Sequence, residues 1–195
     1  LAEKGRAPHL LVMTATPIPR SLALTVYGDL DLSMIDELPP GRRPVRTHLR
    51  FEDSRSKVMD FVRDEIAAGG RVFMVYPMID LSEEIEAAAL TEREESVRDA
   101  LPGIEVEVLH GRLERTRREE AISRFRDGSV QVLLATTVVE VGVDVPEATV
   151  IIIESAQRFG LSQLHQLRGR VGRGERQAWC ILMADEGLGE DARRR

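Results

Sequence analysis

The sequence predicts an α/β fold in which helices cover both faces of a mostly parallel sheet. From Val45 onward, short apolar runs alternate with segments of helical periodicity, the order that crossovers between parallel strands produce. The apolar runs, such as Val150-Ile-Ile-Ile153, are continuous, as expected for strands buried on both faces. Hydrophobic residues make up 43% and charged residues 31% of the 195 residues, a profile typical of a globular domain.

The expected elements follow one another with short connections. Strands are expected over 45–49, 71–78, 104–109, 130–135, 148–153 and 177–183, and helices over 54–68, 82–101, 113–127 and 161–171. We expect the charged helix over 82–101 to be irregular at 89–92. Gly128 is placed to cap the end of the helix before it.

The first part of the chain has no sheet of its own. A strand over 10–13, a helix over 19–27 and a strand over 30–35 precede Pro39-Pro-Gly-Arg-Arg-Pro44, whose three prolines and glycine prevent regular structure. We therefore expect the chain to begin inside one domain and to continue, after a linker over 39–44, into a second.

Charge and cysteine usage exclude several classes of protein. The net charge of −6 argues against binding nucleic acid through bulk charge, although arginines gather at 42–50, 112–118 and 168–176. These clusters fit local sites for an anionic ligand, and solvated helix faces explain them equally well. No apolar run approaches the ~20 residues of a membrane helix, and no signal-peptide pattern opens the chain. The single Cys180 excludes an internal disulfide and suits a reducing cytoplasm. Because it lies in a predicted core strand, we expect Cys180 to have a packing role.

The stretch 168–174 places three arginines and three glycines in seven residues. If the helix over 161–171 extends into it, Arg170 and Arg173 face the same way. Two guanidinium groups presented together suit a polyphosphate or a nucleic-acid backbone. An ordinary solvated helix end is the alternative. The polar loops after Met13, Leu109, Ala135 and Ile153, where ligands of parallel sheets bind, are expected to collect with this stretch at one carboxyl edge.

Three motifs resemble those of a known protein family. Thr14-Ala-Thr16 resembles motif III of superfamily 2 helicases, Ala135-Thr-Thr-Val-Val-Glu-Val-Gly142-Val-Asp144-Val-Pro146 resembles motif V, and Gln166-Leu-Arg-Gly-Arg170-Val-Gly-Arg173-Gly174 resembles motif VI. The longer strings Met13-Thr-Ala-Thr-Pro-Ile-Pro-Arg20 and Asp36-Glu-Leu-Pro-Pro-Gly41 are similar to those of the bacterial RecG helicases. The likeness covers nearly the whole chain.

The resemblance implies a motor of two RecA-like lobes that binds ATP and DNA across the cleft between them. Residues 1–38 would be the end of the first lobe, 39–44 the linker, 45–186 the second lobe and 187–195 a tail. The implied partners are DNA, the first lobe and a DNA-wedge domain of the same protein, with no membrane. We also expect the protein to be cytoplasmic, as the resemblance implies.

The resemblance assigns four residues to the nucleotide. Arg170 and Arg173 would reach the γ-phosphate, with Arg173 as the arginine finger that neutralises charge in the transition state. Gly142 and Asp144 would lie at the nucleotide edge, with Asp144 contacting ribose or orienting an arginine. A turn former before Val145 is the alternative for Asp144.

Further residues are assigned to DNA and to coupling. Exposed N–H and hydroxyl groups of Thr136 and Thr137 would hold the DNA phosphate backbone, with His110, Gly111 and Arg112 as a second contact. Helix capping is the alternative for the two threonines, and a local hydrogen bond at a strand end is the alternative for His110. The coupling of nucleotide state to lobe closure would fall to Thr14, Thr16 and Gln166.

Half of an ATP site has no counterpart in the sequence. The chain has no Gly-Lys pair and hence no phosphate-binding loop. Asp36-Glu37 leads into prolines and is interpreted as linker. We therefore expect the Mg²⁺ ligands to lie outside this chain, no metal site within it, and no ATP hydrolysis by the chain alone.

The implied parent is an ATP-dependent DNA helicase that remodels branched DNA, such as stalled forks and Holliday junctions, in DNA repair and recombination. Two alternatives stay open. One is the transcription-repair coupling translocase, which shares the motif III and motif VI strings. The other is a non-enzymatic interaction domain that has kept the lobe and lost the motor.

Overall fold

A computed structural model describes residues 41–77, 83–111, 113–136 and 145–187, with Leu11, Met13, Ser33, Ile35 and Glu37 as single positions before them. For residues 83–88 only the backbone is described. The chain divides into two compact units, Leu1–Glu37 and Leu38–Arg195, and the fold below is that of the second. The elements predicted over 10–13, 19–27 and 30–35 lie outside the described residues.

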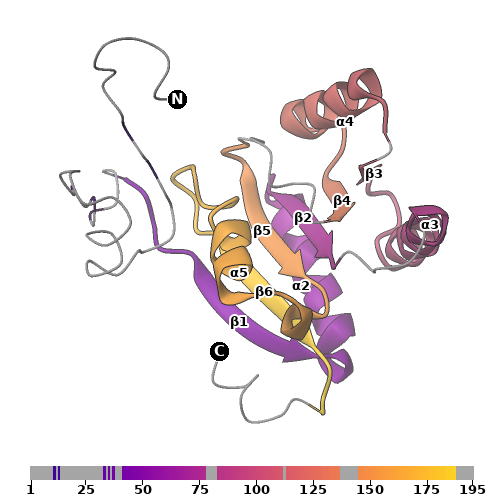
Figure 1. Ribbon diagram of the computed structural model, residues 1–195, viewed down its shortest axis with the longest axis horizontal. Helices are drawn as coiled ribbons and strands as arrows, with labels where there is room; N and C mark the ends of the chain where they lie inside the picture. The colour runs from indigo at the N-terminus through magenta and orange to yellow at the C-terminus, as the bar shows by residue number, and fades with distance from the viewer. Residues whose placement is uncertain are drawn as a thin grey trace, which may run out of the picture. The chain divides into compact units, whose positions relative to one another are not determined.

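The described residues form one parallel sheet of six strands (Figure 1) in the order β1-β6-β5-β2-β4-β3. In chain order the strands are β1 (Arg46–Phe51), β2 (Arg71–Tyr76), β3 (Val106–Leu109), β4 (Val132–Thr136), β5 (Ala148–Ile153) and β6 (Trp179–Ala184). Phe73 in β2 lies in register with Leu133 on one side and Ile151 on the other. The prediction of a parallel sheet is confirmed.

Helices cover both faces of this sheet. Two 3₁₀ helices, η1 (Glu52–Ser54) and η3 (Ala156–Arg158), accompany α2 (Arg55–Ala67), α3 (Glu83–Ala100), α4 (Arg115–Asp127) and α5 (Leu161–Arg168). Buried side chains of α2 and α3 form one core cluster with the sheet, and those of α4 and α5 form another. Figure 1 shows α5 in front of β5 and β6, with α2 behind. None of the described helices is long and apolar enough to cross a membrane.

The central strands supply side chains to both clusters because successive residues of a strand point to opposite faces. In β2, Phe73 and Val75 face α4 and α5, whereas Met74 faces α2 and α3. The ring of Phe73 packs 4.7 Å from that of Phe125 in α4, centroid to centroid, and both are fully buried. Burial of each such ring contributes about 1.5–3 kcal/mol relative to exposure. The strands are continuous apolar runs because both faces are covered.

Most predicted elements are confirmed to within a few residues, and two details are wrong. The helix α3 has no break at 89–92; Ala89 and Leu90 favour helix, and Glu94 pairs with Arg98 one turn later at 2.7 Å. The helix predicted over 161–171 ends at Arg168. Gly128 ends α4 in the left-handed conformation, with a φ of 89°, as predicted.

The thiol of Cys180 is part of the core. Its residue is 1% exposed in β6, and burial raises the pKa of the Cys180 thiol to about 12. A thiol held neutral in this way is a small apolar packing group. The packing role predicted for Cys180 is therefore confirmed.

Candidate functional site

The arginine- and glycine-rich loop that follows α5 lies at the amino edge of the sheet. A Cβ on Gly174 would sit 2.8 Å from the carbonyl oxygen of Pro146, just before β5. A Cβ on Gly172 would sit 2.8 Å from the side chain of Val45, just before β1. These close approaches explain why glycine occupies both positions.

This placement corrects the expectation that all the polar motifs share the carboxyl edge. The helix α5 starts after the carboxyl end of β5 and carries the chain back across the sheet before β6 begins. The residues at its start therefore lie at the carboxyl edge, and Arg170 and Arg173 lie at the amino edge. Gln166, exposed near the end of α5, belongs to the connection between them.

Arg170 and Arg173 are held by a turn and not by a helix. The amide of Gly169 donates to the carbonyl of His165 at the end of α5, and the amide of Arg170 donates to that of Leu167 at 2.9 Å. Gly172 then adopts a φ of 74°, which turns the chain. Their alignment on one helix face is therefore not the arrangement found. Arg173 is exposed, with its Nε 3.3 Å from the carbonyl oxygen of Gly169.

The segment that enters the lobe is bonded to the same loop. The Nε of Arg42 donates to the carbonyl oxygen of Gly172 at 2.8 Å. The side-chain amide of Gln177 donates to the carbonyl of Pro44 at 2.9 Å. The loop, the start of β1 and the start of β6 thus form one connected surface. The predicted nucleotide residues Gly142 and Asp144 lie outside the described residues.

The carboxyl edge carries the predicted DNA contacts that the structure describes. His110 and Gly111 directly follow β3, and Thr136 is the last residue of β4. His110 is half-buried and Gly111 is exposed. The structure thus brings these residues to one edge of neighbouring strands. Thr137, Arg112, Thr14 and Thr16 lie outside the described residues.

The hydroxyl of Thr136 is buried, contrary to the exposure we expected. The residue is 1% exposed, and its Oγ1 has no hydrogen-bond partner among the described residues. Leaving a buried hydroxyl unpaired costs about 1–3 kcal/mol. Such unpaired buried groups are rare in folded proteins.

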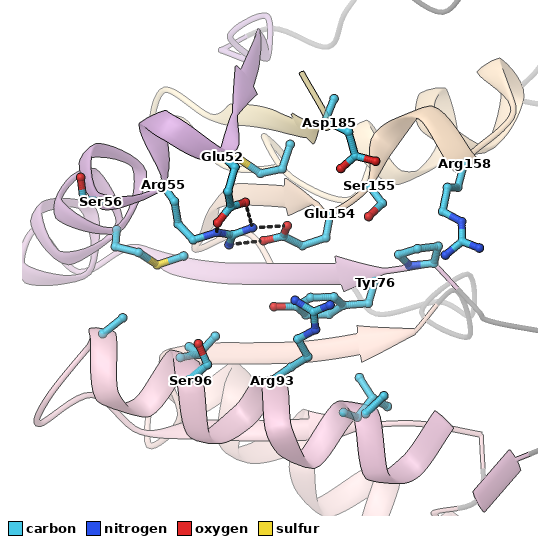
Figure 2. A pocket seen from close by; sticks show the side chains of 18 of the residues that line it. Glu52, Arg55, Ser56, Tyr76, Arg93, Ser96, Glu154, Ser155, Arg158 and Asp185 are labelled. Carbon is cyan, nitrogen blue, oxygen red and sulfur yellow. Dashed lines mark hydrogen bonds and ion pairs between the residues drawn. The ribbon is translucent and has the colours of Figure 1, made fainter. Parts of the chain in front are cut away.

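A cavity of about 800 Å³ opens at the same edge, on the side of α2 and α3. Thr136, Tyr76 and Glu154, from the ends of three strands, line it together with residues of both helices. Figure 2 shows Arg93 and Ser96 on one side, with Arg55, Glu154 and Arg158 on the other. Its volume falls in the range of about 300–1,000 Å³ typical of ligand sites.

An ion-pair network lines this cavity. Arg55 at the start of α2 donates two hydrogen bonds of 2.9 Å to the carboxylate of Glu154 and also binds Glu52. Glu154 is 5% exposed. The hydrogen bonds to Glu154 and Glu52 raise the pKa of Arg55 further, and the bond from Arg55 lowers the pKa of Glu52. Sequence reasoning missed this network; a carboxylate directly after three isoleucines was its only local signal.

Two further arginines of the lining, Arg93 and Arg158, form no ion pair among the described residues. The guanidinium of Arg93 lies 5.5 Å from the ring centroid of Tyr76, a cation–π contact. Burial raises the pKa of Tyr76, so the phenol is neutral at physiological pH. The positive charge of Arg93 also lowers the pKa of Glu52, so Arg93 lies near the network of Arg55. The guanidinium groups of Arg93 and Arg158 can each bind an anionic group.

No cluster suited to a metal ion occurs in the ranges that the structure describes. Three or more His, Cys, Asp or Glu side chains do not converge anywhere among those residues. The chemistry available at the two edges is therefore that of guanidinium groups, hydroxyls and backbone amides.

Comparison with known proteins identifies the family. The helicase conserved C-terminal domain matches residues 54–175. The ATP-dependent DNA helicase RecG of Synechocystis sp. is 48% identical over 100% of this chain and 24% of its own length. RecG of Aquifex aeolicus is 50% identical over 95% of this chain and 24% of its own. The chain thus spans about a quarter of the length of the curated relatives it matches.

Solved structures agree with this assignment. A RecG bound to a three-way DNA junction superposes with a TM-score of 0.77, at 45% identity over 93% of this chain and 23% of that one. Dbp5 of S. cerevisiae, at 17% identity and a TM-score of 0.58, shares the fold alone. The sheet with its two helical layers is the RecA-like lobe of these helicases. The chain belongs to the helicase conserved C-terminal domain family, and it is similar to RecG helicases along its whole length.

Proposed function

We propose that this chain is the second RecA-like lobe, with the end of the first, of an ATP-dependent DNA helicase that remodels branched DNA in repair and recombination. The observation that carries the proposal is the similarity to RecG over the whole chain, including a RecG bound to a three-way DNA junction. The exposed Arg173 on a glycine-bounded turn is consistent with it.

The amino edge is the half of the ATP site that this chain supplies. Arg170 and Arg173 lie on the arginine- and glycine-rich loop after α5, and guanidinium groups fit a polyphosphate by charge and geometry. ATP with Mg²⁺, when bound, supplies the phosphoryl group that water attacks. Arg173 neutralises the charge that develops on the γ-phosphate. Gly142 and Asp144 contribute to the same nucleotide site, and the Mg²⁺ ligands come from the first lobe.

The carboxyl edge is the DNA side of the lobe. His110 and Gly111 after β3, with Arg112 and Thr137, contact the sugar–phosphate backbone. Because α5 joins this edge to the loop of Arg170 and Arg173, closure on ATP and the grip on DNA change together. Gln166 on α5, with Thr14 and Thr16 of the first lobe, takes part in that coupling.

The test uses the complete protein that contains this chain. ATP hydrolysis and strand separation are measured with a synthetic three-way junction and with linear duplex DNA of the same length. We expect both activities to depend on DNA, and strand separation to favour the junction. Absence of DNA-dependent hydrolysis in pure, folded protein contradicts the helicase. Hydrolysis on duplex DNA without strand separation of the junction favours a translocase instead.

A further inference from the structure

The cavity between α2 and α3 combines four features, and contacts to the sugar–phosphate backbone of DNA alone would not need this combination. Its floor contains apolar side chains, among them Met59 and Leu90. Its lining includes Arg93 and Arg158, both exposed and both without an ion pair among the described residues. A planar guanidinium covers the ring of Tyr76. The unpaired Oγ1 of Thr136 is buried in its lining.

Most acidic side chains of the lining already have a partner. Glu52 and Glu154 both pair with Arg55, and Asp60 pairs with Arg63 at 2.8 Å. The carboxylate of Asp185 accepts a hydrogen bond of 2.6 Å from the side chain of Gln157. The lining thus holds four arginines and four carboxylates, and Arg93 and Arg158 are the two arginines that form no ion pair among the described residues.

These features together match the chemistry of one nucleotide. A phosphate is bound by guanidinium groups, and a base stacks on a guanidinium plane or an aromatic ring. The outer face of the exposed Arg93 is available for such stacking, because its inner face lies on Tyr76. The buried hydroxyl of Thr136 requires a polar partner, and the edge of a base offers one.

We propose that this cavity binds a single unpaired nucleotide of a DNA strand, with its phosphate on Arg93 and Arg158, its base stacked on Arg93, and its base edge hydrogen-bonded to Thr136. A paired base is excluded because it is stacked within the duplex and cannot enter a pocket without leaving the stack. The inference rests on the proposed function, since it adds to the DNA edge a reader of unpaired nucleotides at a branch point.

The test measures the affinity of the complete protein for three probes. The first is a three-way junction with a few unpaired thymidines at the branch point, the second a fully paired duplex of the same length, and the third thymidine monophosphate. Arg93→Ala is expected to weaken binding of the gapped junction about tenfold, the size of one stacking contact, and binding of the duplex less than twofold. Arg93→Lys keeps the positive charge but lacks the planar guanidinium group. Its affinity for the gapped junction should lie between those of the unaltered protein and of Arg93→Ala.

Arg117→Ala is the matched control. Arg117 is an exposed arginine of α4, on the opposite face of the sheet, paired with Glu120 at 3.1 Å. Its loss removes the same charge and should change the affinities for junction and duplex equally. The proposal is overturned if Arg93→Ala weakens the binding of junction and duplex equally, or if it weakens the binding of neither. Saturable binding of thymidine monophosphate that the gapped junction does not displace assigns the cavity to a free nucleotide and also overturns it.

Thr136→Val separates a ligand contact from packing. The variant removes the unpaired hydroxyl and keeps the shape, so the melting temperature should rise while the affinity for the gapped junction falls. A fall in both marks Thr136 as a packing residue and contradicts its part in the site. ATP hydrolysis stimulated by the duplex is measured in parallel in the unaltered protein. Its absence refutes the helicase itself, whereas its presence without discrimination of unpaired nucleotides refutes only this inference.

Discussion

Arg55 at the start of α2 and Glu154 after β5 form a doubly hydrogen-bonded ion pair, with both bonds at 2.9 Å, across 99 residues of sequence. The pair spans β6, which lies between β1 and β5 in the sheet. Because Glu154 is 5% exposed, its charge has little access to water and depends on Arg55. The ends of the strands at the cavity are thereby held in place.

Glu154→Gln is expected to lower the free energy of unfolding of this chain by about 1–3 kcal/mol, because Arg55 loses its buried partner and retains only Glu52. Glu119→Gln is the matched control, since Glu119 also accepts from an arginine, at 2.7 Å, with a side chain 62% exposed. That change should cost less than about 0.5 kcal/mol. Urea denaturation followed by the fluorescence of Trp179, the only tryptophan, measures both. Equal losses of unfolding free energy in the two variants would contradict the structural role assigned to Glu154.

Gly172→Ala is expected to cost more than Gly103→Ala. Both glycines have a similar positive φ, 74° and 80°, so both substitutions carry about 1–2 kcal/mol of backbone strain. Only at Gly172 would the new Cβ also collide with a neighbour, the side chain of Val45 at 2.8 Å. The difference in the free energy of unfolding between the two variants, from urea denaturation, isolates the close approach. No difference would mean that Val45 moves aside freely.

Arg173→Ala in the complete protein is expected to reduce ATP hydrolysis by about 10³-fold or more, as for other arginine fingers, while DNA binding persists. Arg176→Ala in the same loop region is the control, because Arg176 points to Glu65, 3.8 Å away. Steady-state phosphate release and DNA binding are measured side by side. Near-normal turnover of the Arg173 variant would contradict the finger assignment.

The chain alone is expected to hydrolyse no ATP above background, with or without DNA. It has no Gly-Lys pair, and a phosphate-binding loop of that type cradles the phosphates and places the lysine. Phosphate release from purified chain, with the complete protein as positive control, measures this. DNA-stimulated turnover by the chain would show that the assignment of the two half-sites is wrong.

Alkaline pH is expected to destabilise the fold through Cys180. Above the ordinary thiol pKa of 9.0, the unfolded chain releases a proton that the folded chain keeps until about 12. Stability therefore falls as pH rises through this window, by about 1.4 kcal/mol between pH 8 and pH 10. Cys180→Ala should be less stable at both pH values but should lose less between them. An identical loss in the variant would exclude the thiol as the source.

Local sequence patterns were sufficient for the sheet but not for its loops. The strand over 148–153 was predicted to the residue, because a continuous apolar run allows only one interpretation between Pro146 and the polar Glu154. The end of α5 was predicted three residues late, because periodicity ignores the left-handed turn that Gly172 makes. Helical spacing was thus a poor guide to the geometry of Arg170 and Arg173.

The wrong edge assignment had a different cause. Arg170 and Arg173 were grouped with the loops at the carboxyl ends of strands, although a helix that joins parallel strands must end near the amino edge. That constraint was available from the sequence. The pairing of Arg55 with Glu154 was not, because it depends on the order β1-β6-β5, which no local pattern encodes.

The bond between Arg42 and the carbonyl of Gly172 joins the segment before β1 to the arginine- and glycine-rich loop. Gly172 is the neighbour of Arg173. A displacement of Arg42 therefore reaches this loop through a single hydrogen bond, without passing through the core. Under the proposed function, the segment that leads into the lobe thereby influences where Arg173 lies.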